Sequence, residues 1–235
     1  MEHSFTWLSA LRSAVPLLEP LPEHALTSIF VTLLLIGLAL VVRLRMGRPE
    51  DAVVPDERVS VGLIAQYFVE GMSSLAEGVI GHGAVRYVPL LGSFFIFILV
   101  SNLLGLIPGF LPPTSDFNIT LGLGVVSFVA YHVCGLQEHG PKYIRQFLGP
   151  VLWLAPLMVV VEVFSHTFRP ISLGIRLFAN LLADHTVLAV FTGFFPHVLL
   201  PVPFYVLGAF VSVIQAFVFT MLSAIYIALA VSHEH

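Results

Sequence analysis

The chain has 235 residues, of which 57% are hydrophobic and only 10% carry a formal charge, and its mean hydropathy is +0.96. A soluble domain of this length would expose many more charged side chains, so the composition excludes a sizeable water-soluble domain and indicates several membrane-spanning helices. The net charge of −4 and the lack of a basic patch argue against a nucleic-acid-binding protein.

The first 44 residues predict an interfacial segment followed by a membrane anchor. Residues 1–24 lack the basic leader and compact apolar core of a signal peptide, and Trp7 among scattered charges is typical of a segment at the membrane surface. The apolar run 25–44 is long enough to cross a bilayer and stops at a group of arginines. We therefore expect this first span to be retained as an anchor.

The middle of the chain predicts one helix that lies at the interface and two that cross the membrane. Residues 59–83 carry apolar side chains at helical spacing, but Glu70 and Glu77 interrupt them, which favours an amphipathic interfacial helix. The apolar runs 88–107 and 119–135 each predict a spanning helix.

The last third predicts two very long helices, over residues 151–194 and 199–231, with a proline-rich turn between them. A helix of forty residues is about 60 Å long, whereas the hydrocarbon core of a bilayer is about 30 Å thick. We therefore expect strong tilt or bending, or a break at Pro156 or Pro170. Together the patterns predict an all-α integral membrane protein, a single membrane domain over residues 1–235, with about five spanning helices plus the interfacial one.

Lysine and arginine in the connecting segments predict the orientation. The stretch after the first span holds five arginines, Arg43, Arg45, Arg48, Arg58 and Arg86. The loop after residue 135 holds Lys142 and Arg145, whereas the loops 108–118 and 195–203 hold no basic residue. This distribution predicts that the N-terminus lies outside and that the basic loops and the C-terminus lie in the cytoplasm.

Four charged side chains in the apolar last third share one broad face of a helix, because seven, seven and eight residues separate Glu162, Arg169, Arg176 and Asp184. A guanidinium stays protonated when it is buried, and at the centre of a membrane helix it costs roughly 2.5–3.5 kcal/mol. No carboxylate lies three or four residues from Arg176, so we expect its counter-charge on another helix or another subunit.

Arg176 divides two groups of titratable side chains. Glu162, with His166 nearby, lies about 21 Å away along an ideal helix, toward the predicted inner face. Asp184, followed by His185, lies about 12 Å away toward the outer face. Protons hop among carboxylates, imidazoles and water, but a fixed positive charge raises an electrostatic barrier against them. The pattern predicts two half-pathways that cannot leak into each other, and a partner that carries the proton around Arg176.

Structural roles compete with these functional ones. Glu162 and Arg169 could form an ion pair, and His166 could be a hydrogen-bonded core histidine. Asn180 and Gln215 could join two helices through hydrogen bonds worth about 0.6 kcal/mol each. The structural interpretation is weakest for Arg176, which has no carboxylate within easy helical reach.

Three segments make a family resemblance recognisable. The segment RPISLGIRLFANLLADH, residues 169–185, closely resembles the signature of the a subunit of F-type ATP synthases, the membrane stator beside the rotor ring. Two further matches are VIQAFVFTMLSAIYIALAVSHEH at the C-terminus and SNLLGLIPGF followed by SDFNITL. Three ordered motifs are a far more specific signal than any one of them, and only the N-terminal part of the chain is loosely matched.

The resemblance implies a proton-translocating stator subunit of the membrane Fo sector, which offers two offset half-channels to the rotor c-ring and couples proton motive force to rotation and ATP synthesis. Arg176 would face the carboxylate of each passing rotor subunit, weaken its hold on a proton and prevent a short circuit. The outer half-channel, or the surroundings of the arginine, would include Asn118, Asn180, Asp184, His185 and Gln215. The inner half-channel would include Glu162, His166 and Ser172.

The resemblance also implies the setting of the chain. Its partners would be the rotor c-ring, the b subunits of the peripheral stalk and membrane lipid, in a bacterial cytoplasmic (inner) membrane. No cofactor, metal or nucleic acid is implied. The chain has no phosphate-binding glycine loop, so we expect no enzyme activity from it alone.

One position departs from the family pattern. Many members carry an ionisable residue on the sixth helix, seven residues before the glutamine, where this chain has Gly208. Asp184 and His185 adjoin each other on the fifth helix instead, and adjacent helical residues diverge by about 100°. Since Asp184 lies closer to the arginine face, we hypothesise that it takes over part of the outer relay.

Two other classes of function stay open on the sequence. A stand-alone secondary transporter or channel would conduct protons without a rotor ring. An intramembrane metalloenzyme would use His132, His166, His185 and Asp184 as ligands. The spacing of these residues does not match the paired histidines of zinc proteases, and no HExxH motif occurs.

Overall fold

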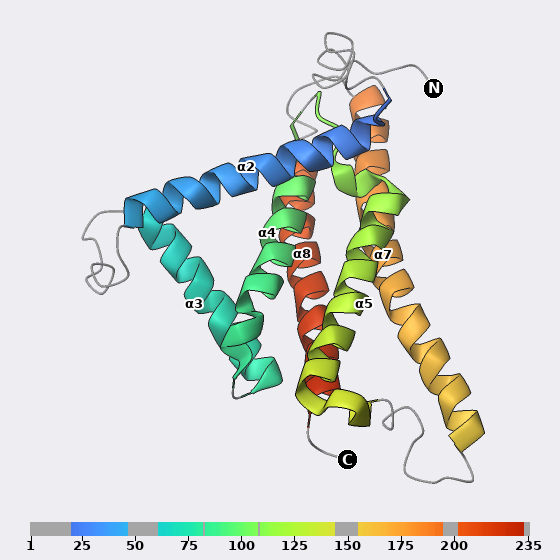
Figure 1. Ribbon diagram of the computed structural model, residues 1–235. Helices are drawn as coiled ribbons and strands as arrows, with labels where there is room; N and C mark the ends of the chain where they lie inside the picture. Colours follow the sequence, from blue (N-terminus) through green and yellow to red (C-terminus); the bar gives the residue numbers. More distant parts are fainter. Residues whose placement is uncertain are drawn as a thin grey trace. The chain divides into compact units, whose positions relative to one another are not determined.

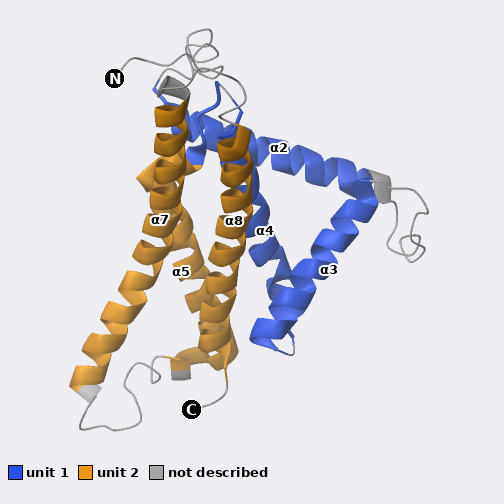
Figure 2. Ribbon diagram, turned by 180° about the vertical axis from the view of Figure 1, so that it is seen from behind, with its two compact units in different colours: residues 1–113 blue, residues 114–235 orange. Residues whose placement is uncertain are grey.

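The computed structural model describes residues 20–46, 61–81, 83–107, 109–143, 155–194 and 202–232. Every regular element within these ranges is a helix (Figure 1). The helices fall into two compact units, residues 1–113 and residues 114–235, which Figure 2 distinguishes by colour.

The first unit contains three α-helices that contact one another, α2 (Glu23–Met46), α3 (Val61–Ile80) and α4 (Val88–Leu104). The connection from α3 to α4 uses Gly81 and Gly83, both at positive φ, and the 3-10 turn Ala84–Tyr87. Glycine adopts this backbone conformation without steric cost, which lets the chain reverse direction within a few residues. Phe68 of α3 and Phe95 of α4 then pack with ring centroids 5.8 Å apart.

The second unit carries the residues that the sequence marks as functional, and it is built from α5 (Phe117–His139), α7 (Ala155–Phe194) and α8 (Val202–Val231). α5 packs against both α7 and α8, and α7 and α8 also contact each other. Asp116 begins α5, because its Oδ1 accepts a hydrogen bond from the backbone N–H of Asn118 at 2.8 Å and so caps the helix. The N-terminal end of α7 leans away from α8 in both ribbon views (Figures 1 and 2).

Two glycines let α5 and α7 approach until their backbones touch. A Cβ atom on Gly124 would collide with the carbonyl oxygen of Pro170. A Cβ atom on Gly174 would lie 3.0 Å from the Cα of Leu121. Because backbone atoms cannot move aside as a flexible side chain can, both positions require glycine for this packing.

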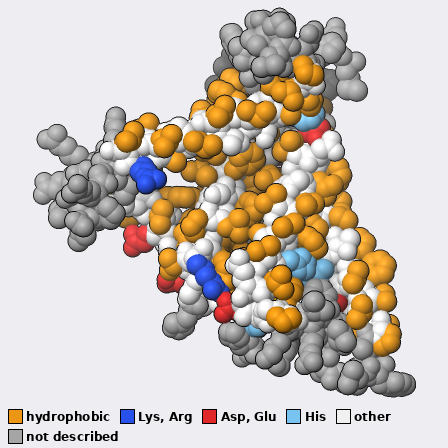
Figure 3. Space-filling model, viewed as in Figure 1, with side chains coloured by type: hydrophobic (Ala, Val, Ile, Leu, Met, Phe, Trp, Pro, Cys, Tyr) orange, Lys and Arg blue, Asp and Glu red, His pale blue; other side chains and the backbone are white. Residues whose placement is uncertain are grey.

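The predicted fold class is confirmed. Among the described residues, five helices are long and apolar enough to cross a membrane, and α3, the helix predicted to lie at the interface, is not among them. The last two are long, with 40 residues in α7 and 30 in α8. Exposed hydrophobic side chains are spread over the described surface drawn in Figure 3, as expected of helices that face lipid.

Pro170 lies inside α7 without ending it. Proline lacks the N–H that would bond to the carbonyl oxygen four residues earlier, and here Pro170 is buried against α5. The helix therefore stays continuous, and the break considered at Pro170 is absent from the described residues 155–194.

Parts of several predicted features lie outside the described residues. They are residues 1–19 of the N-terminal segment, Arg48 and Arg58 in the first connector, residues 59–60 of the interfacial helix, Arg145, residues 151–154 of the first long helix, the turn at 195–201, and residues 233–235. The single membrane domain stays a prediction.

Candidate functional site

Arg176 lies on the face of α7 that is not buried by other helices. The residues that α7 buries recur every three or four positions, at Pro170, Leu173, Gly174, Leu177 and Leu181. Arg176 is exposed, as are Ala179 and Asn180 one turn further along the helix. Within the described part of the chain, no side chain forms a hydrogen bond or an ion pair with the Arg176 guanidinium.

This placement puts a permanent positive charge on the surface of an apolar helix that is long enough to span a membrane. A guanidinium that faced lipid there would cost roughly 2.5–3.5 kcal/mol. A polar or anionic group beyond the described contacts is therefore the favourable neighbour for Arg176.

Asn180 joins α7 to α8 one turn beyond Arg176. Its Nδ2 donates a hydrogen bond to Oε1 of Gln215 at 2.6 Å. Gln215 is only 4% exposed, and its Nε2 has no hydrogen-bond partner among the described residues. A buried amide N–H without a hydrogen-bond partner is rare in native proteins and calls for a specific explanation.

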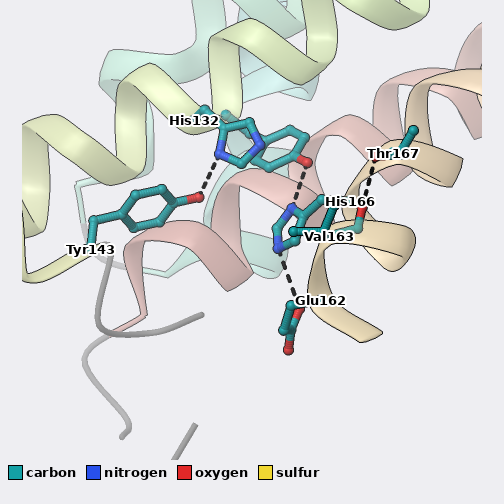
Figure 4. A network of polar contacts seen from close by, with 7 residues as sticks. His132, Tyr143, Glu162, Val163, His166 and Thr167 are labelled. Carbon is teal, nitrogen blue, oxygen red and sulfur yellow. Dashed lines mark hydrogen bonds and ion pairs between the residues drawn. The ribbon is translucent and has the colours of Figure 1, made fainter. Parts of the chain in front are cut away.

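A second group of polar side chains lies nearer the N-terminal end of α7 (Figure 4). The hydroxyl of Tyr131, from α5, lies 2.7 Å from Nδ1 of His166. On the other side of the same imidazole, Nε2 lies 3.4 Å from Oε2 of Glu162, one turn earlier on α7. His166 therefore connects a buried phenol to a half-buried carboxylate. Among the described residues, the ion-pair contact of Glu162 is with His166, whereas Arg169, the partner considered as an alternative, packs on aromatic rings.

His132 and Tyr143 continue this group toward the end of α5. Nδ1 of His132 lies 2.9 Å from the hydroxyl of Tyr143, and the rings of His132 and His166 have centroids 5.1 Å apart. Tyr143 follows the 3-10 turn Gly140–Lys142, just beyond the spanning segment. Burial raises the pKa of the Tyr143 hydroxyl above its ordinary value of 10.0, an effect that the Arg169 charge opposes and the Glu162 charge reinforces.

Arg169 is held by aromatic rings. Its Cζ lies 4.9 Å from the ring centroid of Tyr226 and 5.8 Å from that of Tyr131. A guanidinium within about 6 Å of an aromatic centroid is attracted by the negative face of the ring. Arg169 and Arg176 are thus two cations seven residues apart on the same long apolar helix, one packed on aromatic rings and the other exposed.

The remaining predicted residues lie at separate positions in the second unit. Asp184 and His185 are both half-buried on α7. Ser172 is exposed, and its Oγ donates to the carbonyl oxygen of Arg169 at 2.9 Å. Asn118 is exposed in the first turn of α5. Asn180 and Gln215 form one direct contact and Glu162 and His166 another.

Sequence reasoning did not identify Tyr131 and Tyr143 as members of the site, and considered His132 only as a metal ligand. The sequence does contain a signal for two of these residues, because Tyr131 and His132 are adjacent side chains with polar ends in a predicted membrane-spanning run. Their partner His166 lies 35 positions from Tyr131 in the sequence. Among the described residues, no group of three His, Cys, Asp or Glu side chains is arranged to hold a metal ion.

Comparisons with known proteins agree on one family. The family described as "ATP synthase A chain" matches residues 25–228. The chain is similar to the ATP synthase subunit a of Bdellovibrio bacteriovorus, with 45% identity over 213 residues, which cover 90% of this chain and 93% of the relative. It is 41% identical to that of Geotalea uraniireducens over 237 residues, and 38% identical to that of Geobacter sulfurreducens over 237 residues, each match covering 100% of both chains.

Proposed function

The chain belongs to the ATP synthase A chain family, and from this premise we propose that it forms two offset proton half-channels beside the rotor ring of the complex. The family and the apolar helices make it an integral membrane protein of the Fo sector, with a proton-translocating stator role. Proton flow through the half-channels would turn the ring and so couple proton motive force to ATP synthesis.

The observation that carries this proposal is the exposure of Arg176 on an apolar helix, without a partner among the described residues. A carboxylate on each passing rotor subunit would supply the missing counter-charge. Close to a guanidinium, a carboxyl group loses its proton more readily, because the positive charge stabilises the ionised form. The proton released on one side of Arg176 cannot pass directly to the other, because it meets a fixed charge of the same sign.

The half-channels would be divided by this arginine. Asp184 and His185 follow it on α7, and with Asn118 they would line the outer half-channel, while Asn180 and Gln215 lie beside the arginine. Glu162 and His166 precede it and would line the inner half-channel, with Ser172 between them and the arginine. The distribution of Lys and Arg supports an orientation with the N-terminus outside and the C-terminus in the cytoplasm.

The partners would be the c-ring, the b subunits of the peripheral stalk and lipid of the bacterial cytoplasmic membrane. The chain would not make or hydrolyse ATP itself. Each proton that crosses releases about 2.3 kcal/mol per 100 mV of membrane potential, and this energy would reach the nucleotide-binding part of the complex through rotation.

Reconstitution tests the proposal against a stand-alone channel. The complete complex in liposomes should pump protons with ATP, whereas the purified chain alone should leave the liposomes as tight as protein-free ones. In the complete complex, Arg176→Ala should abolish ATP-driven pumping while the complex still assembles. Proton conduction by the chain alone, or pumping by Arg176→Ala at the wild-type rate, would contradict the proposal.

A further inference from the structure

The group around His166 has the connectivity of a proton relay. Two titratable residues of α5, Tyr131 and His132, lie against His166 of α7. Tyr143 joins His132 from the segment after α5 (Figure 4). These contacts join titratable groups rather than apolar side chains, so the apolar packing of the helices does not account for them.

We propose that Tyr143, His132 and Tyr131 form the inner inlet of the proton pathway, and that His166 transfers protons from this inlet to Glu162. The proposal rests on the proposed function and names the side chains through which protons would reach its inner half-channel. Protons would then pass through the interior of the second unit between α5 and α7.

The contacts of the two ring nitrogens of His166 define the central step: Nδ1 is hydrogen-bonded to the Tyr131 hydroxyl at 2.7 Å, and Nε2 lies 3.4 Å from the Glu162 carboxylate in an ion-pair contact. A neutral imidazole has one N–H donor and one acceptor nitrogen. When Glu162 is ionised, Nε2–H of His166 donates to the carboxylate and Nδ1 accepts from the hydroxyl of Tyr131. When Tyr131 gives its proton to Nδ1, Nε2 releases its own proton to Glu162.

The balance of protons then closes at Tyr131. Its oxygen regains a proton from His132 through an intervening water, because the contact that the two residues make is one of ring against ring, with centroids 4.3 Å apart. His132 is replenished in turn through its contact with the Tyr143 hydroxyl and from water of the cytoplasmic side. One proton has then moved from that water to Glu162, and every relay residue is again neutral. The imidazole of His166 now carries its proton on Nδ1 instead of Nε2, so it must change tautomer, by rotation of the ring or by exchange with water, before the next proton passes. Under the opposite driving force, the same steps run in reverse.

The charged and titratable groups around the relay come from every element that packs against it. They are Tyr131 and His132 on α5, Tyr143 after the 3-10 turn, Glu162, His166 and Arg169 on α7, and Tyr226 on α8. Arg169 stacks on Tyr226 and Tyr131, so a positive charge stands beyond the relay on the way toward Arg176. This charge disfavours a proton that continues along α7 and favours its delivery to the carboxylate.

The experiment uses the complete ATP synthase complex in liposomes, with Tyr131→Phe, His132→Gln and Tyr143→Phe in this chain. Each variant keeps a side chain of similar size, so the helices retain their packing. The matched control is Ser223→Ala, which removes the buried 2.8 Å hydrogen bond between Ser127 and Ser223 that joins α5 to α8 without any titratable group. ATP-driven pumping and ATP synthesis are measured from about pH 6 to about pH 9 on the cytoplasmic side.

If the relay operates, Tyr131→Phe and His132→Gln each reduce proton flux by about tenfold or more, and the deficit grows as cytoplasmic-side pH rises and protons become scarce. The double variant, with Tyr131→Phe and His132→Gln together, has a proton flux no lower than that of the slower single variant, because both substitutions interrupt the same series of proton transfers. Ser223→Ala keeps the wild-type rate and pH profile. Equal pH profiles for wild type and all three relay variants would overturn the relay.

Two further outcomes separate the relay from its premise. If Tyr131→Phe fails to assemble, Tyr143→Phe decides whether the relay operates, because phenylalanine keeps the ring that packs on Gly135 of α5 and removes only the hydroxyl. Arg176→Ala is measured in the same liposomes. If Arg176→Ala abolishes pumping while the relay variants match wild type, only the relay is wrong; if Arg176→Ala pumps normally, the proposed function itself fails.

Discussion

Asn180 and Gln215 form a direct amide–amide hydrogen bond of 2.6 Å between α7 and α8, one helical turn from Arg176. The bond fixes the rotation of α7 relative to α8 at the level where the arginine is exposed. Hydrogen bonds between membrane helices contribute little to the free energy of unfolding, so the main effect of this one is to orient α7 relative to α8.

A double-mutant cycle measures this bond. We expect Asn180→Ala and Gln215→Ala to show a coupling free energy of about 0.6 kcal/mol, with an upper bound of about 1.7 kcal/mol. The measurement is thermal unfolding of the complex in detergent for both single variants and the double variant. Strict additivity of the two effects would mean that the amides do not bond in the assembled protein.

The two intramembrane arginines should respond differently to the same change. Arg169→Met removes contacts with two aromatic rings and should destabilise the fold by about 0.5–2 kcal/mol. Arg176→Met removes no bond within the described chain and should leave the unfolding temperature of the complex close to that of wild type, while pumping is lost. Parallel unfolding and pumping assays distinguish the two, and Arg169→Lys is the control that keeps the charge. Equal destabilisation by both methionine variants would contradict the difference in their surroundings.

The outer relay can be assigned with two substitutions on α7. If Asp184 compensates for Gly208, Asp184→Asn should reduce ATP-driven pumping by about tenfold or more, because an amide cannot release a proton. His185→Ala should have the smaller effect. The opposite result, with Asp184→Asn unchanged and His185→Ala inactive, would assign the relay to the histidine.

Gly124 and Gly122 provide a matched pair on α5. Gly124→Ala places a methyl group against the backbone of Pro170 and should reduce stability by about 1–3 kcal/mol, as overpacking commonly does. Gly122→Ala has no atom within 4 Å of the new methyl group and should be neutral or slightly stabilising, because alanine favours helix. Yield of assembled complex and unfolding temperature report both effects. A stable Gly124→Ala variant would show that α5 and α7 are less closely packed.

Tyr143 predicts a stability change at alkaline pH. Burial raises the pKa of its hydroxyl in the folded protein, so the folded state disfavours the phenolate. The stabilising contribution is therefore complete below the unfolded value of about 10 and is lost as pH rises through the folded pKa. Tyr143→Phe should make the decline in stability above pH 10 less steep, as measured by thermal unfolding at a series of pH values. Tyr67, an exposed tyrosine of α3, provides the control substitution.

The fold could be predicted from the sequence because an apolar run of about 20 residues is long enough to cross a bilayer as a helix, whatever the individual residues within it. The ends of helices were harder to predict. α5 continues to His139, four residues beyond the expected end at 135, because a helix can extend past the hydrocarbon when polar residues such as Gln137 and Glu138 follow the apolar run. Pro170 is tolerated inside α7, and its packing against Gly124 could not be read from either residue alone.

The part of the candidate site that depends on residue spacing within one helix could be predicted from the sequence. The exposure of Arg176 agrees with the absence of a carboxylate three or four residues away, which is a local property of one helix. The contact of Tyr131 with His166 depends on the register between α5 and α7, and this register is set where Gly124 meets Pro170 and Gly174 meets Leu121. The spacing of residues within each helix does not predict how the two helices align with each other.

Gly174 lies two residues before Arg176 and rests against the backbone of Leu121. The guanidinium therefore projects from a stretch of helix braced by main-chain atoms, which yield far less than side chains that can change rotamer. A lateral force on Arg176 would be transmitted through Gly174 to the backbone of α5, which resists displacement. The smallest residue in this turn would thus supply the rigidity that the proposed role of Arg176, a stationary charge beside a moving rotor, requires.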